Sequence, residues 1–395
     1  MRLAVFSDYS YSMSDGQLFA EMSFARFVLG LAPHCQRLVV IGRLDRSGRQ
    51  YAYRMDGVEF VPLPHYDSGA DLVRVLRVIP AGARQFWRAL DDVDTVWLMG
   101  PNPPQTLVFA VIAMLRRRRL VLGVRQRLLQ LMRYRYPHRR LVQGAAAILE
   151  AAFRMMAVVV PVVAVGPDIA HQYRRAAKLH VLYVSLYREA DIVSADEDHR
   201  DYQGTDWRIL SVGRLDPEKN PLLLADILKQ ACDRDRRWRL EVCGDGPLTG
   251  QLARRLEDLG IADRATLHGY VAIDSGLWEL YRRSHVLLHV SFTEGFPQVL
   301  LEAFAARLPV VATAVGGVPG VVQGRGWLVP PGDAPSAVAA LTEVVEDVGR
   351  REAFVERAVQ EAGQHTLERE CARLAVFLAD GDTEKSPNPP LGTAD

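Results

Sequence analysis

The chain has 395 residues, of which 49% are hydrophobic and 24% charged, and a net charge of +1. This length suggests two domains, and the composition is that of a soluble globular protein. The four cysteines have no metal-ligand spacing and no obvious pairing, so we expect a reducing, cytoplasmic setting. They are Cys35, Cys232, Cys243 and Cys371.

The first half of the chain alternates strand and helix patterns. Residues 3–7 predict a strand rather than a signal peptide, because the apolar run is too short for one. A loop around residues 14–16 and a helix at residues 17–32 follow. Further strands are expected at residues 38–41, 95–99, 120–124, 162–165 and 180–184, and further helices at residues 105–117 and 168–177. This alternation predicts a parallel, doubly wound sheet.

The most apolar region of the sequence covers residues 144–165. It is interrupted by Glu150, Arg154 and Pro161, and it is therefore unsuited to cross a bilayer. We expect a buried helix followed by a strand.

The alternation restarts after a polar linker at residues 191–206. Strands are expected at residues 207–212, 239–243, 266–268, 286–290, 309–313 and 327–329, and helices at residues 221–232, 248–259, 276–283, 297–307 and 334–348. The expected organisation is a domain at 1–190 and a domain at 207–350, followed by helices at 351–379 and a disordered tail at 380–395. Packing of the helices at 351–379 back on the first domain is one of the arrangements we consider. Ligands of such sheets bind outside the carboxyl ends of the strands.

The two halves of the chain differ in charge. Residues 1–190 hold 26 Lys and Arg against 14 Asp and Glu, and the remainder holds 22 against 33. No acid occurs between Asp94 and Glu150, a stretch with ten arginines from Arg116 to Arg140. Two interpretations stay open: a solvated face, or contact with an anionic or lipid-linked acceptor or with the inner face of an anionic membrane. We expect no nucleic-acid partner.

The segment around Glu294 and Glu302 is the most informative part of the sequence. The two carboxylates lie eight residues apart, in a loop and in the helix that follows it. Pro297 suits the first helical position, because its missing N–H would have no partner there. The free amides around it form an anion site at the positive end of the helix. Both carboxylates can therefore reach one ligand, such as a polyol that carries a phosphate.

A second cluster follows the first strand of the second domain. Gly213 allows a close turn, and Arg214 and Lys219 bracket a helix start with two cations. A diphosphate leaving group needs such neutralisation, because charge builds on it as its bond breaks. The chain has four lysines, so Lys219 hints at a specific need for a compact point charge. An ordinary capped surface helix would explain the same residues.

Together these motifs resemble the nucleotide-binding domain of the GT-B glycosyltransferases, and specifically glycosyltransferase family 4 (glycosyltransferase group 1). The resemblance covers about residues 205–345. It is carried by VGRLDPEK at residues 212–219, GDGP at 244–247, LHGY at 267–270, EGFP at 294–297, Glu302, and AVGGVP at 314–319. The ordered set is highly specific, whereas each motif alone is not.

The resemblance implies an α/β protein of the GT-B fold, in which two doubly wound Rossmann-like domains face each other across a cleft. It implies retaining transfer of a sugar from a nucleoside diphosphate, such as UDP or GDP, with no obligatory metal and no cofactor. Arg214 and Lys219 would then hold the diphosphate. Glu294 would hold sugar hydroxyls with the amides of residues 295–297, and Glu302 would hold the ribose hydroxyls. The expected catalytic residues are Arg214, Lys219 and Glu294; the expected donor-binding residues are Gly16, Gly213, Gly244, Asp245, Tyr270, Gly295, Phe296, Pro297 and Glu302.

The first half departs from the family pattern at two places. Family members place a glycine-rich loop after the first strand, whereas Gly16 stands alone here. Many also place a histidine after the strand that ends at Val124, where this chain has Arg125. Arg125 is a candidate transfer-site residue that contacts the donor phosphate or an anionic acceptor; an ordinary surface arginine is the alternative.

Our first hypothesis is therefore a glycosyltransferase with its donor in the second domain and an unidentified acceptor, either a glycan, a lipid-linked sugar or a small molecule, in the first. A phosphorylase or nucleotide-sugar-cleaving enzyme of the same fold is a second hypothesis. A non-catalytic binding protein at the membrane edge is a third, and it comes from a different functional class.

Overall fold

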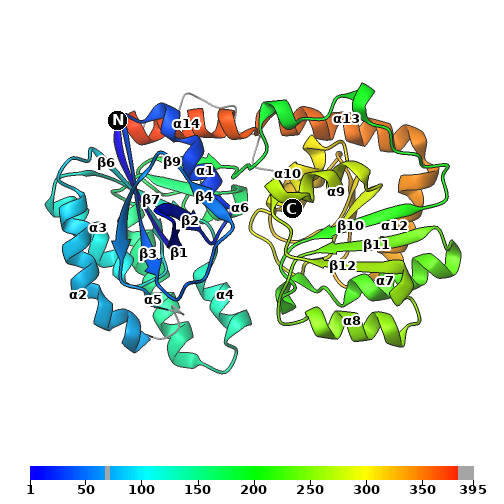
Figure 1. Ribbon diagram of the computed structural model, residues 1–395, viewed down its shortest axis with the longest axis horizontal. Coiled ribbons are helices and arrows are strands. Elements are labelled where there is room, and N and C mark those ends of the chain that lie inside the picture. Colours follow the sequence, from blue (N-terminus) through cyan, green and yellow to red (C-terminus); the bar gives the residue numbers. More distant parts are fainter. Residues whose placement is uncertain (67–71, 381–395) are drawn as a thin grey trace. The chain divides into compact units, whose positions relative to one another are not determined.

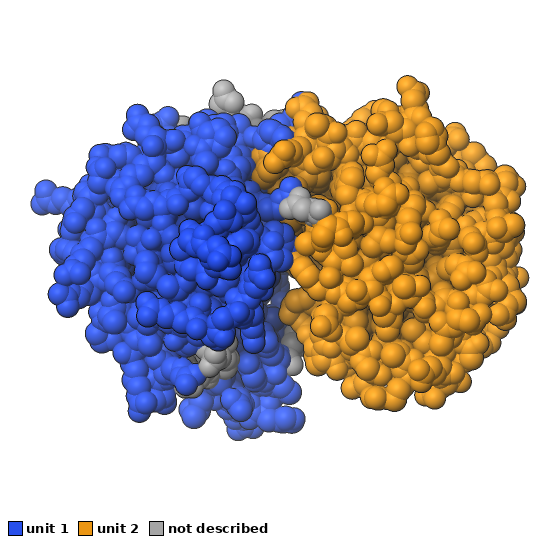
Figure 2. All heavy atoms as spheres, viewed as in Figure 1, with its two compact units in different colours: residues 1–184, 368–395 blue, residues 185–367 orange. Residues whose placement is uncertain are grey.

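The computed structural model describes residues 1–66 and 72–380, and it divides the chain into two compact α/β units (Figures 1 and 2). Unit 1 comprises residues 1–184 together with 368–395, and unit 2 comprises residues 185–367. The expected linker therefore falls within unit 2. Of the tail predicted at 380–395, all but Asp380 lies outside the described residues.

Unit 1 is built on a parallel sheet in the order β5-β3-β1-β6-β7-β8-β9. The strands are β1 (Arg2–Ser14), β3 (Arg37–Asp45), β5 (Glu59–Leu63), β6 (Thr95–Gly100), β7 (Arg119–Val124), β8 (Val162–Val165) and β9 (Leu179–Leu182). Except in the edge strands β5 and β9, their apolar runs are buried on both faces, as is typical of parallel strands.

Helices cover both faces of this sheet (Figure 1). One face carries α2 (Leu72–Ala89), α3 (Gln105–Leu115), α5 (Arg140–Ala157) and α6 (Pro167–Gln172), which contribute Phe86, Phe109, Phe153 and Ile169 to one core. The short helix α4 (Leu128–Arg135) packs against α5. The C-terminal helix α14 (Leu367–Asp380) lies beside α1 (Phe24–Gly30), and the Cys371 thiol donates to the Phe27 carbonyl.

The helix predicted at residues 17–32 is wrong in its first half. Residues 17–20 form strand β2 (Gln17–Ala20), which pairs antiparallel with the end of β1 and with β4 (Tyr53–Met55). Asp15 and Gly16 join the two strands with φ values of 51° and 74°. This two-residue Asp-Gly turn is a strong hairpin signal, because both central positions need positive φ.

Unit 2 contains a second parallel sheet, in the order β12-β11-β10-β13-β14-β15. The strands are β10 (Trp207–Val212), β11 (Trp238–Cys243), β12 (Ala265–Gly269), β13 (Val286–His289), β14 (Val310–Thr313) and β15 (Trp327–Val329). The helices are α7 (Leu223–Arg234), α8 (Thr249–Asp258), α9 (Leu277–Arg283), α10 (Gln298–Ala305), α11 (Val318–Val322), α12 (Ala334–Glu346) and α13 (Val348–Gln364). The predicted parallel, doubly wound arrangement is thus confirmed in each unit.

The helix and strand predicted at residues 144–165 are present as α5 and β8, but the expected burial of the helix is wrong. On its inner face, Phe153 packs in the core of the sheet and Leu149 packs with Leu128 of α4, whereas Leu141, Ile148 and Met155 are exposed.

Candidate active site

A pocket of about 250 Å³ lies in unit 2 at the carboxyl ends of β10 and β13. Six of the predicted site residues line it: Gly213, Arg214, Lys219, Glu294, Phe296 and Pro297. The loop after β10 supplies the first three, and the loop between β13 and α10 supplies the others. The pocket thus lies where ligands of parallel α/β sheets bind.

Two donors and the ring of His289 converge on one oxygen of Glu294. The Lys219 ammonium donates to Glu294 Oε1 at 2.5 Å and the Ser291 hydroxyl donates to it at 2.7 Å. His289 Nε2 lies 2.9 Å from the same oxygen. Among the described residues, Oε2 of Glu294 has no hydrogen-bond partner. The carboxylate is therefore held rigidly through one oxygen while the other remains able to accept from a ligand.

These contacts keep Glu294 ionised. Burial alone would raise the pKa of this carboxyl, since its side chain is 6% exposed. The hydrogen bond with the His289 ring and the positive charge of Lys219 outweigh burial and lower the pKa to about 2. Glu294 is consequently a carboxylate at every physiological pH.

Helix α10 presents its amino end to the pocket. Its first residues, Gln298 and Val299, line the cavity, and their N–H groups precede the first intrahelical hydrogen bonds. Pro297 is extended, with φ −79° and ψ 109°, so it flanks the helix instead of occupying its first turn as predicted. The expected anion site at the positive end of the helix does not depend on this difference of one residue.

Glycines let the surrounding loops approach each other closely. A Cβ on Gly316 would lie 1.9 Å from the Glu294 carbonyl oxygen, and a Cβ on Gly244 would lie 1.8 Å from that of Gly213. Gly244 also has φ 151°, which side chains disfavour. These two glycines therefore allow the backbone of their own loops to pack directly on the backbone of the two loops that line the pocket.

Arg214 is positioned by its own loop. Its guanidinium forms ion pairs with Asp216 and Glu218, and 55% of its side chain is exposed. Lys219 ends a 3-10 turn (Pro217–Lys219), after which Asn220 adopts the left-handed conformation with φ 52°. Both cations line the pocket.

The other predicted donor residues of unit 2 lie outside the lining of this pocket. Glu302 is buried inside α10, where its Oε2 accepts from the Tyr281 hydroxyl at 2.8 Å. Tyr270 is exposed after β12. Asp245 holds its own turn, because its Oδ1 accepts from Gly246 N and the Thr249 hydroxyl. Gly295 takes part in another close loop contact, because its carbonyl oxygen would collide with a Cβ on Gly317.

Sequence reasoning missed His289 and Ser291. His289 was hidden in an apolar strand, yet it is the last residue of β13 and therefore stands at the ligand-binding edge. Ser291 follows it by two residues, and its carbonyl accepts from the Thr313 hydroxyl at 2.7 Å. A polar residue that ends a buried parallel strand was the available signal.

Gly16 and Arg125 belong to unit 1. Gly16 lies at the tip of the β1–β2 hairpin, so no glycine-rich loop follows β1 at this point. Arg125 directly follows β7, and its guanidinium lies 4.7 Å from the Tyr9 ring centre and 5.1 Å from that of Phe24. The structure thus holds Arg125 between aromatic rings and not as a freely solvated surface arginine.

A buried charge cluster lies beside Arg125. Arg43 Nε lies 3.1 Å from Asp8 Oδ1, and the Tyr66 hydroxyl donates to the same carboxylate. Burial raises the pKa of Asp8 to about 6, against the opposing effects of Arg43, Tyr66 and Arg125. Burial also lowers the pKa of Arg125 to about 10, which the Asp8 carboxylate counteracts.

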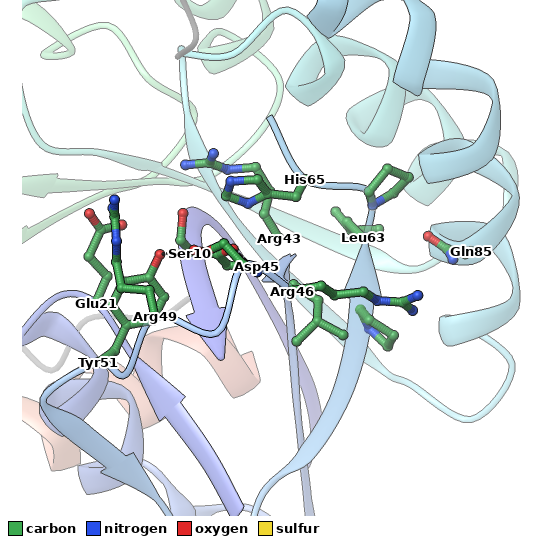
Figure 3. Close-up of a pocket in the computed structure, with 14 residues that line it drawn as sticks. Ser10, Glu21, Arg43, Asp45, Arg46, Arg49, Tyr51, Leu63, His65 and Gln85 are labelled. Carbon is green, nitrogen blue, oxygen red and sulfur yellow. Dashed lines mark hydrogen bonds between the residues drawn. The ribbon is translucent and has the colours of Figure 1, made fainter. Parts of the chain in front are cut away.

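A second pocket, of about 750 Å³, lies in unit 1 beyond the ends of β3 and β5 (Figure 3). Glu21, Arg49 and Tyr51 gather on one side of it, and Arg46 extends toward the side of Gln85. Asp45 is fixed at the end of β3, where it accepts from Ser47 N and the Tyr51 hydroxyl, both at 2.8 Å. Guanidinium, carboxylate and hydroxyl groups therefore share one cavity, which suits a polar ligand.

Residues 1–66 and 72–380 contain no group of three or more His, Cys, Asp or Glu side chains arranged to hold a metal ion. In the same ranges, no helix combines the length and the apolarity that a bilayer crossing requires.

A comparison with protein families finds a match over part of the chain. Residues 195–361 match the family of glycosyl transferases group 1. The pocket of unit 2 and its Glu294 cluster lie entirely within this match.

Curated relatives cover only part of this chain. A D-inositol 3-phosphate glycosyltransferase of Corynebacterium glutamicum is 34% identical over 181 residues, which are 43% of this chain and 42% of that protein. The gpi3 subunit of a phosphatidylinositol N-acetylglucosaminyltransferase of Schizosaccharomyces pombe is 35% identical over 29% of this chain and 25% of that protein. The chain thus spans less than half the length of these two relatives.

Solved structures match over both units. HepE of Anabaena, solved with UDP and glucose, has a TM-score of 0.69 at 17% identity, over 96% of this chain and 99% of that one. WaaG, a glycosyltransferase involved in lipopolysaccharide biosynthesis, has a TM-score of 0.70 at 15% identity, over 96% and 100%. These are GT-B glycosyltransferases, and the likeness confirms the predicted GT-B fold.

Proposed function

We propose that the protein is a retaining glycosyltransferase that moves a sugar from a nucleoside diphosphate to an acceptor hydroxyl. The convergence of Lys219, His289 and Ser291 on Glu294, at the amino end of α10, carries this proposal. It places a fixed carboxylate beside an anion site, within the part of the chain that matches group 1 glycosyl transferases. A donor that combines hydroxyls with phosphates needs both features.

The diphosphate binds at the start of α10 in this proposal. The free amides of the helix and the Lys219 ammonium neutralise the charge that grows on the leaving oxygen as the bond to the anomeric carbon breaks. Arg214 exchanges part of its pairing with Asp216 and Glu218 for the phosphate, which its exposure permits. Two cations and a helix end supply the neutralisation, so we propose that catalysis needs no metal ion.

The two carboxylates recognise different parts of the donor. Oε2 of Glu294 accepts from a hydroxyl of the transferred sugar, while Oε1 stays bound to its three protein partners. Glu302 accepts from the ribose hydroxyls and is oriented by Tyr281. The backbone around Tyr270 faces the base.

The acceptor side of the reaction is assigned to unit 1. We propose that the 750 Å³ pocket takes the acceptor, because its guanidinium and carboxylate groups suit hydroxyls together with an anionic group. Arg125, held over Tyr9 and Phe24, takes the position of the family's histidine and contacts the donor phosphate or the acceptor.

A thermal-shift panel of UDP, GDP, ADP and TDP tests the donor assignment, followed by incubation with the sugar nucleotide of the base that binds. We expect one base to stabilise the protein, nucleoside diphosphate to be released, and the sugar to keep its anomeric configuration. Release of sugar phosphate on addition of phosphate would identify a phosphorylase instead, and release of free sugar alone a cleaving enzyme. No binding and no release would contradict the enzyme assignment.

A further inference from the structure

After its first residue, the outer face of α5 is apolar except for Arg154. Beyond its first residue, α5 exposes six side chains or backbone positions: Leu141, Gly144, Ile148, Ala151, Arg154 and Met155. Leu141, Ile148 and Met155 repeat every seven residues on one stripe and expose 86%, 70% and 70% of their surface. Val158 and Val159, directly after the helix, are exposed too. An ordinary helix on a globular surface has a polar outer stripe, whereas after its first residue α5 exposes one polar side chain, Arg154.

Helix α3 extends this apolar surface. Its exposed residues near the C-terminus are Val111, Met114 and Leu115. Helices α3 and α5 pack against each other, and they lead into the neighbouring parallel strands β7 and β8. Their C-terminal ends therefore lie at the same edge of the sheet. We call the surface formed by the exposed apolar residues 111, 114, 115, 141, 148, 155, 158 and 159 the α5 face.

Arginines border the α5 face at both ends. Arg133, Arg135, Arg139 and Arg140 are exposed around the start of α5, and Arg116, Arg117 and Arg118 follow Leu115 at the other end. Among the described residues of α2, α3, α4 and α5, the one acid is Glu150, which is buried and accepts from Arg154 and from Leu129 N. The surface is therefore both apolar and strongly positive.

The acids near this surface already have arginine partners. Asp91 pairs with Arg116, and Asp92 and Asp94 pair with Arg2. Arg116 also stacks on Trp87 of α2, with its guanidinium 5.0 Å from the ring centre. Among the described residues, the helices of this surface thus present no exposed carboxylate that would repel an anionic partner.

We propose that the α5 face docks this protein on an anionic lipid bilayer. The apolar stripe enters the boundary between headgroups and acyl chains, and the bordering arginines bind lipid phosphates. The pairing of a continuous apolar helix face with a surrounding cationic rim favours lipid over a protein partner, because a bilayer surface offers apolar and anionic layers at adjoining depths. The proposal does not depend on the transfer reaction, since it rests on residues outside both pockets.

Co-sedimentation of the full chain with vesicles tests the proposal. We expect binding to vesicles that contain phosphatidylglycerol, weaker binding to vesicles of phosphatidylcholine alone, and a decline as salt is added. Ile148→Glu should lower the apparent affinity roughly tenfold or more, because a charge replaces an apolar side chain at the lipid boundary. The double variant Arg139→Gln, Arg140→Gln should lower affinity roughly tenfold and flatten the salt dependence.

Val376→Glu is the matched control. Like Ile148, Val376 is an exposed, branched apolar residue of unit 1, but it lies on α14, so its replacement should leave vesicle binding unchanged. Thermal melting of both Glu variants verifies that they fold. Equal vesicle binding by wild type and Ile148→Glu, or equal binding to neutral and anionic vesicles, would overturn the proposal. Self-association of the wild type that Ile148→Glu abolishes would instead make the α5 face an interface between copies.

Discussion

The pockets of the two units are built from different parts of the chain. In unit 2, backbone contributes much of the site, through close loop contacts at Gly244 and Gly316 and the free amides of α10, beside the side chains of Lys219 and Glu294. In unit 1, side chains form it, with Arg46, Arg49 and Glu21 around the cavity. A site made of backbone tolerates few sequences, whereas a site made of exposed side chains is changed by single substitutions without affecting the fold.

The family match also distinguishes the two pockets. The family match covers residues 195–361, which include the whole backbone-built pocket and none of the side-chain-built one. We therefore propose that unit 2 binds the donor through features shared with the matched family, and that unit 1 carries the features particular to this protein. Four substitutions test that division, from the largest expected effect to the smallest.

Replacing Lys219 tests the cation at the donor pocket. Lys219→Met should slow release of nucleoside diphosphate on the order of a hundredfold, because one stabilising group for the developing charge is lost. The measurement is the rate of diphosphate release at saturating donor. Lys229→Met is the matched control, since Lys229 pairs with Asp233 on the surface of α7. Equal rates of diphosphate release in the two variants would contradict a role of Lys219 in the donor site.

Replacing Gly244 tests the close contact between loops. Gly244→Ala should destabilise the protein by on the order of 3 kcal/mol, because its Cβ collides with the Gly213 carbonyl and its φ is unfavourable. Denaturant unfolding measures this. In α13, Gly363→Ala meets no neighbour and should be neutral or stabilising. An unchanged free energy of unfolding for Gly244→Ala would show that the loops separate at no cost.

Replacing Glu302 tests ribose recognition apart from stability. Glu302→Gln keeps the volume of the buried side chain and should weaken nucleoside diphosphate binding about tenfold, since a charged acceptor is lost. Calorimetric titration with the diphosphate that binds measures the change. Tyr281→Phe, which removes the donor to Glu302, should have a smaller effect in the same direction. Unchanged affinity in Glu302→Gln would exclude the ribose contact.

Replacing Asp8 tests the buried charges of unit 1. The pKa of Asp8 is raised to about 6 in the folded chain, from an ordinary value of 3.8, so the folded state takes up a proton more readily than the unfolded state. The stability that Asp8 contributes therefore grows as pH falls through about 6, by about 1 kcal/mol between about pH 7 and 5. Asp8→Asn should lack this increment. Parallel pH profiles of the free energy of unfolding for the two proteins would contradict the shift.

Much of this molecule was predictable from the sequence, and the failures have physical causes. Most strands of both sheets follow from apolar runs, and the cluster of Lys219 and Glu294 follows from loops at strand ends. The short strands β2, β4 and β5 were not predicted. The hairpin around Gly16 was missed, because the Asp-Gly turn was taken for a loop before a helix. His289 was missed inside an apolar strand, since its role depends on which edge of the sheet it reaches.

The features of unit 1 were the hardest to predict from the sequence. Asp8, Arg43 and Tyr66 are far apart in the sequence and meet only when β1, β3 and the segment after β5 align. The apolar residues of α5 were read as core, because a helix that is apolar on both faces gives no sequence sign of which face is covered.

The most direct test of the account is calorimetric titration of UDP, GDP, ADP and TDP into three proteins. These are the wild type, Lys219→Met in unit 2, and Arg46→Ala in unit 1, whose side chain lines the other pocket. We predict that the wild type binds at least one diphosphate, that Lys219→Met binds it more weakly, and that Arg46→Ala binds it as the wild type does. Binding by none of the four, or weakening by Arg46→Ala but not by Lys219→Met, would contradict the placement of the donor in unit 2.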